Sequence, residues 1–213
     1  MNKALRYAFS KTLAVAVLVS GSLFTVAANA DVSYNIGWAS EYHYRGIFQK
    51  TSSASAGIDF EEGGFYIGSW MADVGDGMEI DGYLGYGIET EAGFSASIGF
   101  TGYYYTGDFD DTYEEVNLGF GYGLVSIDYA IGEYDGGGGA DYDFLSATVD
   151  ISDTGFALTY GTFGDDFDGD YIEIGYGTSV AELDIGVSLI LASDELAGGD
   201  EDETLVFTIG KSF

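Results

Sequence analysis

Apolar and polar side chains alternate with a period of two residues through almost the whole chain after residue 30. In segment 78–89, for example, Ile80 and Leu84 alternate with Glu79, Asp81 and glycines. Successive side chains of a β-strand point to opposite faces, whereas a helix repeats its apolar positions about every 3.6 residues. The pattern therefore predicts strands that carry one apolar face and one face of small or charged groups.

Twelve such segments can be drawn along the chain. They are expected near 32–45, 52–60, 65–73, 78–89, 94–105, 112–122, 124–134, 142–151, 156–163, 171–178, 181–192 and 204–213. Tight turns are expected at 61–64, 90–93, 122–123, 152–155 and 178–180, and longer acidic loops at 45–52, 73–77, 107–111, 135–141, 164–170 and 194–203. An even number of strands, with long loops at one end and tight turns at the other, is typical of an all-β fold, an antiparallel up-and-down β-barrel.

The first thirty residues have the composition of a cleaved secretory signal peptide. Lys3, Arg6 and Lys11 precede the apolar run 12–26, and Ala28 and Ala30 frame a small-x-small cleavage site. The alternative is an N-terminal membrane anchor, for which the apolar run is short. We therefore expect a signal peptide over 1–30 and one domain, the barrel, over 31–213.

The charge of the remaining chain restricts its partners. The chain after residue 30 contains three basic residues and all 36 acidic residues, which gives a formal charge of −33. A nucleic-acid partner is excluded, because almost nothing could neutralise phosphates. Disorder is also disfavoured, because 46% of the residues are apolar and 16% aromatic. The absence of proline together with 34 glycines favours continuous β-sheet.

Two orientations of the apolar face are compatible with the alternation. A soluble barrel or sandwich would bury that face, whereas a transmembrane barrel turns it towards lipid and keeps polar groups in the lumen. The transmembrane orientation is favoured by the loop asymmetry and by aromatic residues at strand ends. These are Tyr34, Phe60, Phe65, Phe94, Tyr104, Tyr122, Phe156 and Tyr176, and they predict interfacial girdles in the outer membrane of a Gram-negative bacterium.

The inward face of such a barrel would be strongly acidic. The pore-lining candidates are Glu41, His43, Arg45, Asp59, Glu79, Asp81, Glu89, Glu115, Asp128, Asp150, Glu173, Glu182 and Asp184. In the first strand the alternation places Trp38, Tyr42 and Tyr44 on the lipid face. Arg45 is interpreted either as a structural tie to acidic neighbours or as a group that narrows the pore and sets its selectivity. His43 lacks other His or Cys residues with which to bind a metal, so no metal site is expected.

The last segment predicts how the barrel is assembled. Its alternating apolar residues and terminal aromatic residue are Leu205, Phe207, Ile209 and Phe213. This ending resembles the C-terminal signature by which the barrel-assembly machinery recognises bacterial outer-membrane proteins. Lys211 departs from that signature, since its position is usually apolar, and it is expected to extend towards the lipid headgroups.

Residues 40–74 carry a more specific pattern: an aromatic residue before an Arg-Gly pair, then a strand ending in an aromatic residue, then a hairpin with tryptophan. The positions that match are Ser40, Tyr42, Tyr44, Arg45, Gly46, Ile47, 57–60, Gly64, Phe65, Tyr66, Gly68 and Trp70. This segment resembles the opening of the TorF-like porin family of proteobacterial outer membranes. The family often has a proline before its second strand, and this chain has none. The resemblance implies a porin.

These observations predict a porin-like channel for passive diffusion of small solutes, with cations preferred because the lining is acidic. The alternative is a non-conducting barrel that displays acidic loops, with a structural, adhesive or weak divalent-cation-binding role. The carboxylates of 164–170 and 198–203 lack the spacing of an EF-hand loop. No cofactor is expected, and no enzyme, because no catalytic arrangement stands out around the single His43.

Overall fold

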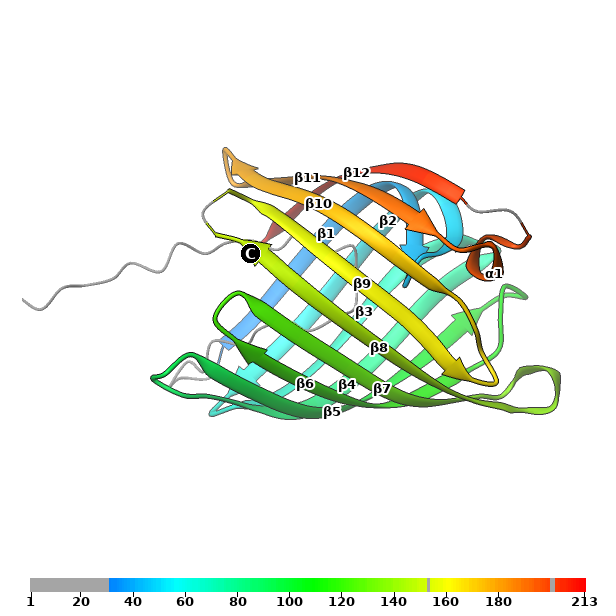
Figure 1. Ribbon diagram of the computed structural model, residues 1–213, viewed down its shortest axis with the longest axis horizontal. Coiled ribbons are helices and arrows are strands. Elements are labelled where there is room, and N and C mark those ends of the chain that lie inside the picture. Colours follow the sequence, from blue (N-terminus) through cyan, green and yellow to red (C-terminus); the bar gives the residue numbers. More distant parts are fainter. Residues whose placement is uncertain (1–30, 153, 200–201) are drawn as a thin grey trace, which may run out of the picture.

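The computed structural model describes residues 31–152, 154–199 and 202–213 of the chain. Twelve strands in these residues form one closed barrel, in which each strand pairs antiparallel with its neighbours in sequence and β1 pairs with β12 (Figure 1). The strands are β1 (Asp31–Tyr44), β2 (Ile47–Glu62), β3 (Phe65–Gly75), β4 (Gly77–Glu89), β5 (Phe94–Thr106), β6 (Tyr113–Tyr122), β7 (Val125–Tyr134), β8 (Ala140–Ile151), β9 (Phe156–Asp165), β10 (Asp170–Val180), β11 (Leu183–Ala192) and β12 (Asp202–Ser212). The predicted fold class is confirmed. The expected signal peptide lies outside the described residues.

The outer surface of the barrel is apolar on every strand. One exposed example from each strand, in chain order, is Val32, Ile58, Ile67, Leu84, Ile98, Val116, Ile127, Leu145, Leu158, Ile172, Ile185 and Leu205. Alternate residues point inward and are mainly small, polar or tyrosine. The soluble alternative is wrong, since such a fold would bury the apolar face. The barrel has the polarity of a transmembrane β-barrel, with its apolar face towards lipid.

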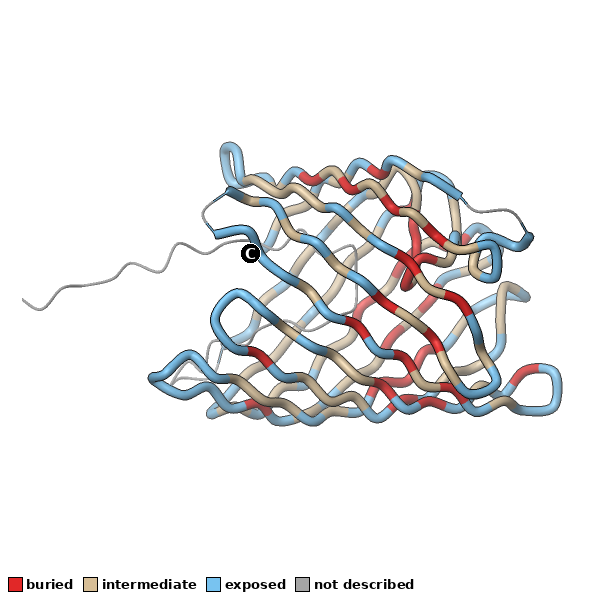
Figure 2. Tube along the Cα trace, viewed as in Figure 1, coloured by how far each residue is buried: buried red, intermediate tan, exposed pale blue. Residues whose placement is uncertain are grey.

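The two ends of the barrel differ. One end of the barrel carries the connections from odd-numbered to even-numbered strands, and we call it the loop end. The other end carries the tight turns and both chain termini of the barrel, and we call it the turn end. The loop end holds the short helices η1 (Gly136–Gly138) and α1 (Asp194–Ala197). No helix among the described residues is long and apolar enough to cross a membrane. Figure 2 shows that buried residues gather towards the loop end, where α1 lies.

Three predicted connections are wrong. A long loop was expected at 45–52, but β2 already begins at Ile47, so a two-residue turn, Arg45 and Gly46, joins it to β1. In place of the second expected loop, 73–77, a single residue, Asp76, connects β3 to β4. Both strand pairs continue past the polar residues because register shifts let the backbone remain paired. The turn expected at 178–180 lies at 181–182, where both residues have positive φ, because β10 and β11 pair up to Val180 and Leu183.

The seam between β1 and β12 closes the barrel. Their pairing runs from Asn35 opposite Ser212 to Ala39 opposite Thr208. Phe213 extends the seam, because its N–H donates to the carbonyl of Tyr34 at 2.9 Å and its carbonyl accepts from the Tyr34 N–H at 3.2 Å. The expected outward alternation is confirmed for Leu205, Phe207 and Ile209, which are exposed. Their role in assembly stays a prediction.

Candidate functional site

The hairpin of β1 and β2 leaves the barrel wall at the loop end and bends into the lumen. After Ser40, the last four residues of β1, 41–44, pair with β2, and the described residues show no pairing of these four with β12. A bulge between Tyr42 and His43 shifts the register. Figure 1 shows the blue end of β1 inside the barrel rather than in its wall. The hairpin tip therefore lies across the lumen.

Gly46 fixes the position of this tip against the opposite wall. A Cβ atom placed on Gly46 would lie 2.9 Å from Cβ of Tyr171 on β10 and 3.0 Å from a methyl carbon of Leu196 in α1. Its φ of 84° and the φ of 50° at Arg45 are both positive, as a two-residue type I′ hairpin turn requires. Glycine is needed here for both the backbone conformation and the close approach.

Arg45 at the hairpin tip forms a bidentate ion pair with Glu115 of β6. Its Nη1 and Nη2 donate to the two carboxylate oxygens at 2.6 and 2.9 Å. The side chain of Arg45 is 5% exposed and that of Glu115 is fully buried. Such parallel N–H···O bonds are among the stronger protein hydrogen bonds. The pair therefore ties the first hairpin to β6, the fourth strand beyond β2 around the barrel.

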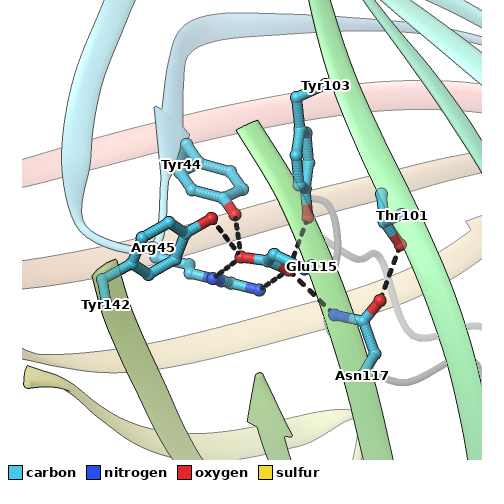
Figure 3. Close-up of polar contacts among 7 residues, drawn as sticks. All are labelled: Tyr44, Arg45, Thr101, Tyr103, Glu115, Asn117 and Tyr142. Carbon is cyan, nitrogen blue, oxygen red and sulfur yellow. Dashed lines mark hydrogen bonds and ion pairs between the residues drawn. The ribbon is translucent and has the colours of Figure 1, made fainter. Parts of the chain in front are cut away.

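Four further groups donate hydrogen bonds to the same carboxylate (Figure 3). The donors are the hydroxyls of Tyr44 (3.3 Å), Tyr103 (3.1 Å) and Tyr142 (2.8 Å) and the amide of Asn117 (2.8 Å). The Arg45 guanidinium also lies 4.2 Å from the ring centre of Phe144 and 4.9 Å from that of Tyr44. Cation–π contacts of this kind strengthen when they are shielded from water. The buried charge of Glu115 is therefore fully compensated.

Apolar packing fills the loop-end half of the lumen around this pair. One cluster of buried residues consists of Ala130, Tyr142, Phe144, Phe163, Tyr171, Ile190, Ala192 and Val206, with Ile47 of the hairpin packed against it. A second consists of Tyr42, Trp70, Ala72 and Val74, with Tyr44 packed against it. The hairpin thus contributes to both clusters. Its position is set by core packing as well as by the ion pair.

The turn-end half of the lumen has a different lining. Most of its inward residues are small or polar, and many of them are only half-buried, including Ser33, Asn35, Ser55, Gly57, Ser97, Gly99, Gly119, Thr148, Thr159 and Gly175. Solvent therefore reaches this half, because half-buried side chains on the inner face retain accessible surface. The lumen is thus wet towards the turn end and packed towards the loop end.

The structure separates the predicted pore-lining residues into three groups. The buried ones lie in the loop-end half and are His43, Arg45, Glu79, Asp81 and Glu115. The half-buried ones are Glu41, Asp59, Asp128, Glu173 and Asp184, while Glu89 and Asp150 are exposed near the turn-end mouth. Glu182 was placed wrongly on a strand: it lies in the β10–β11 turn and pairs with Lys211 at 3.0 Å, because that turn falls later than expected.

Arg45 forms the kind of ion pair that the structural interpretation expects, and its role in selectivity stays a prediction. His43 lies 3.2 Å from Glu41, with its other ring nitrogen buried and without a partner in the described residues. Its ring meets that of Phe48 edge-on at 5.5 Å. No group of three His, Cys, Asp or Glu side chains in the described part of the chain is arranged to hold a metal ion.

The prediction for Tyr42 and Tyr44 is wrong. Tyr42 is 1% exposed, and its hydroxyl donates to Glu79 at 2.5 Å, so it lies inside the barrel and not on the lipid face. Tyr44 also points inward, towards Glu115. The alternation fails here because the bulged hairpin has left the wall, so both of its faces become buried. Period-two counting cannot detect this departure.

The inward tyrosines that hold Glu115 were also missed. Tyr103 belongs to a run of three tyrosines, of which Tyr104 is outward and exposed. Strict alternation then places Tyr103 and Tyr105 inside, so the sequence contained the signal for them. For Tyr142 the signal was weaker, because it stands at the beginning of the segment expected at 142–151.

Comparison with known proteins identifies a family and a shared fold. A family model described as "Bacterial protein of unknown function (Gcw_chp)" matches residues 25–212. No curated protein matches. The crystal structure of the COG4313 outer membrane channel from Pseudomonas putida F1 matches with a TM-score of 0.53 and 10% identity, over 92% of this chain and 100% of that one. At this identity the likeness shows the fold alone, a closed antiparallel β-barrel.

Two larger structures match less well. Acinetobacter baumannii OccAB1 has a TM-score of 0.41 and 12% identity, over 76% of this chain and 58% of that one. Pseudomonas aeruginosa OprD has a TM-score of 0.41 and 13% identity, over 86% of this chain and 66% of that one. The present chain thus spans less than two thirds of the length of each.

Proposed function

Because the chain belongs to the Gcw_chp family of bacterial proteins, whose function is unknown, we propose a function from the barrel itself. The protein is a channel of the Gram-negative outer membrane for passive diffusion of small solutes, and it prefers cations. The apolar exterior and the fold shared with an outer membrane channel support the location and the channel class. The resemblance of residues 40–74 to TorF-like porins supports the same class.

The cation preference rests on one observation: among the described residues, the only guanidinium in the lumen, that of Arg45, is already neutralised. Arg45 forms its ion pair with Glu115, and within the described residues no ion pair joins it to the carboxylates nearer the turn end. Of these, Asp128, Glu173 and Asp184 lie on the lumen face, half-buried and within reach of solvent. A lumen lined by one sign of charge concentrates the opposite ion and repels ions of its own sign.

The inward hairpin is the constriction of the proposed channel. It spans the lumen from β10, which Gly46 contacts, to β6, which Arg45 contacts. Solutes crossing the barrel must pass this segment, so the remaining path at the loop end is narrow. Passage is therefore restricted to small solutes or requires displacement of the hairpin.

Current through single molecules in planar lipid bilayers tests this proposal. Under a potassium chloride gradient, the reversal potential should show a preference for potassium over chloride. Asp128→Asn combined with Glu173→Gln should reduce the preference, because both groups face the lumen. Glu182→Gln is the matched control, since Glu182 lies in an exposed turn outside the lumen, and it should leave the preference unchanged. An anion-selective current would overturn the proposal.

A second candidate function is favoured by the packed loop-end half of the lumen. The two apolar clusters and the buried ion pair describe a barrel that could remain closed and present its acidic loops at the cell surface. The same bilayer experiment separates the candidates, because a closed barrel gives no current although it is correctly folded. Binding of calcium by the acidic segment 164–170, measured by calorimetry, would then support a surface role.

The C-terminal strand is proposed to interact with the barrel-assembly machinery. The exposed apolar row Leu205, Phe207 and Ile209 and the terminal Phe213 support this, because they lie on the lipid-facing side of the seam strand. A partner that binds this strand before the barrel closes would contact its apolar face.

A further inference from the structure

The carboxylate of Asp81 is buried inside the barrel without a partner. Asp81 is 1% exposed, and neither of its oxygens accepts a hydrogen bond from the described residues. It lies on the inward face of β4, between Glu79 and Tyr83 in the period-two pattern. A buried carboxylate without hydrogen bonds is strongly unfavourable, because its charge has lost water and gained nothing in return.

Aromatic residues stand on both sides of this carboxylate. The register places Trp70 of β3 and Tyr103 of β5 directly opposite Asp81, and both are buried on the same inward face. Side chains directly opposite each other in antiparallel strands have Cβ atoms about 4.5–5.5 Å apart. The side chain of Asp81 therefore lies between those of two buried aromatic residues.

Both rings are held in place by other contacts. The ring of Trp70 meets that of Tyr42 edge-on, with centroids 5.8 Å apart. Tyr103 meets Tyr44 edge-on at 5.4 Å and donates its hydroxyl to Glu115. The two rings are thus ordered before any molecule binds, which reduces the entropic cost of binding.

The neighbouring charges leave Asp81 without compensation. Glu79 lies two residues before Asp81 on the same inward face of β4, and Glu115 accepts a hydrogen bond from Tyr103, the residue directly opposite Asp81. Tyr42 satisfies one oxygen of Glu79, and Arg45 neutralises Glu115. The other basic residues after residue 30 pair elsewhere: Lys50 with Asp73, and Lys211 with Glu182. Within the described part of the chain, the three carboxylates of Glu79, Asp81 and Glu115 are thus accompanied by a single guanidinium, that of Arg45, which pairs with Glu115.

We propose that Asp81, Trp70 and Tyr103 form a subsite for the ammonium group of a small organic cation. The ammonium charge meets the carboxylate, while the attached methylene groups lie against the two rings, which attract cations through their faces. The site lies in the packed loop-end half of the lumen, where Trp70 belongs to the same buried cluster as Tyr42 of the hairpin. The inference rests on the proposed channel function and names the class of solute that the channel takes.

Tryptophan fluorescence reports on this subsite directly. The sequence contains two tryptophans, and Trp38 is exposed on the outer face, so the variant Trp38→Phe leaves Trp70 as the sole reporter. The folded protein in detergent is titrated with ethylammonium chloride, and with potassium chloride at the same ionic strength. We expect a saturating change with ethylammonium and none with potassium.

Variants assign the response to Asp81. In the Trp38→Phe background, Asp81→Asn should raise the half-saturating ethylammonium concentration at least tenfold. Asp81→Ser, a smaller uncharged replacement, is a second variant if the first folds poorly, and heat-modifiable migration in gels checks the fold of each. Glu182→Gln is the control, because Glu182 lies in an exposed turn outside the lumen, and it should leave the titration unchanged.

The outcomes separate this inference from the function on which it rests. An equal response to potassium, no response to ethylammonium, or an Asp81→Asn protein that responds as before would each overturn the subsite. Bilayer current is measured on the same preparation. Current without an ethylammonium response would refute the subsite but not the channel function. Absence of current would refute the channel function, whatever the fluorescence shows.

Discussion

Replacing Arg45 with methionine should destabilise the barrel and release the hairpin. The change keeps most of the side-chain volume but leaves the carboxylate of Glu115 buried without its counter-charge. Removing one partner of a buried ion pair generally costs about 3–5 kcal/mol. Four hydrogen-bond donors remain on Glu115, namely Tyr44, Tyr103, Tyr142 and Asn117, so we expect a loss near the lower limit, about 3 kcal/mol.

The measurement is urea unfolding of the protein in lipid vesicles, followed by tryptophan fluorescence. A double-mutant cycle isolates the pair: Glu115→Gln alone should also destabilise, because Arg45 then loses its counter-charge. The double variant should be less destabilised than the sum of the two single changes, because neither charge is left unpaired. The coupling energy should exceed about 1.5 kcal/mol, more than exposed pairs provide.

Lys211→Met provides the matched control. Lys211 also pairs with a carboxylate, at 3.0 Å, but the side chain of Glu182 is 83% exposed. Exposed pairs contribute about 0–1 kcal/mol, so this variant should unfold close to the unmodified protein. Additive effects of the Arg45 and Glu115 changes, or an Arg45→Met loss no larger than that of Lys211→Met, would refute the view that this pair holds the hairpin. Bilayer conductance should rise in Arg45→Met, because the constriction is loosened.

Three further predictions concern topology, assembly and the hairpin turn. On intact cells, a membrane-impermeant thiol probe should label a cysteine introduced at Gly137 and not one at Gly63, because the two lie at the loop and turn ends; the opposite pattern would invert the orientation. Deleting Phe213 should lower the amount of heat-modifiable barrel in the outer membrane, whereas a deletion within 136–139 should not; equal amounts would remove the assembly role. Gly46→Ala should cost about 1–3 kcal/mol more than Gly63→Ala in urea unfolding, because both have positive φ but only Gly46 lacks room for a methyl group; equal losses would contradict the close packing of the tip.

The strand pattern could be predicted from the sequence because it is local. Whether a side chain such as Leu84 faces lipid or the lumen depends on its odd or even position within the strand. The alternation of apolar and polar residues next to it in the sequence shows which of the two applies. The number of strands and the acidic inner face followed from the same rule. The terminal strand was also predictable, because its alternating residues end at Phe213, where the seam with Tyr34 closes.

The path of the first hairpin was decided by the tertiary structure. Arg45 and Glu115 are 70 residues apart, and nothing near either residue indicates that they meet. Strand parity placed Tyr42 on the lipid face, but the bulge beside His43 and the end of β12 pairing at Ala39 free the hairpin from the wall. A buried guanidinium requires a carboxylate at hydrogen-bonding distance. Only the closed barrel brings Glu115 to that place, so the candidate constriction is a property of the assembled fold.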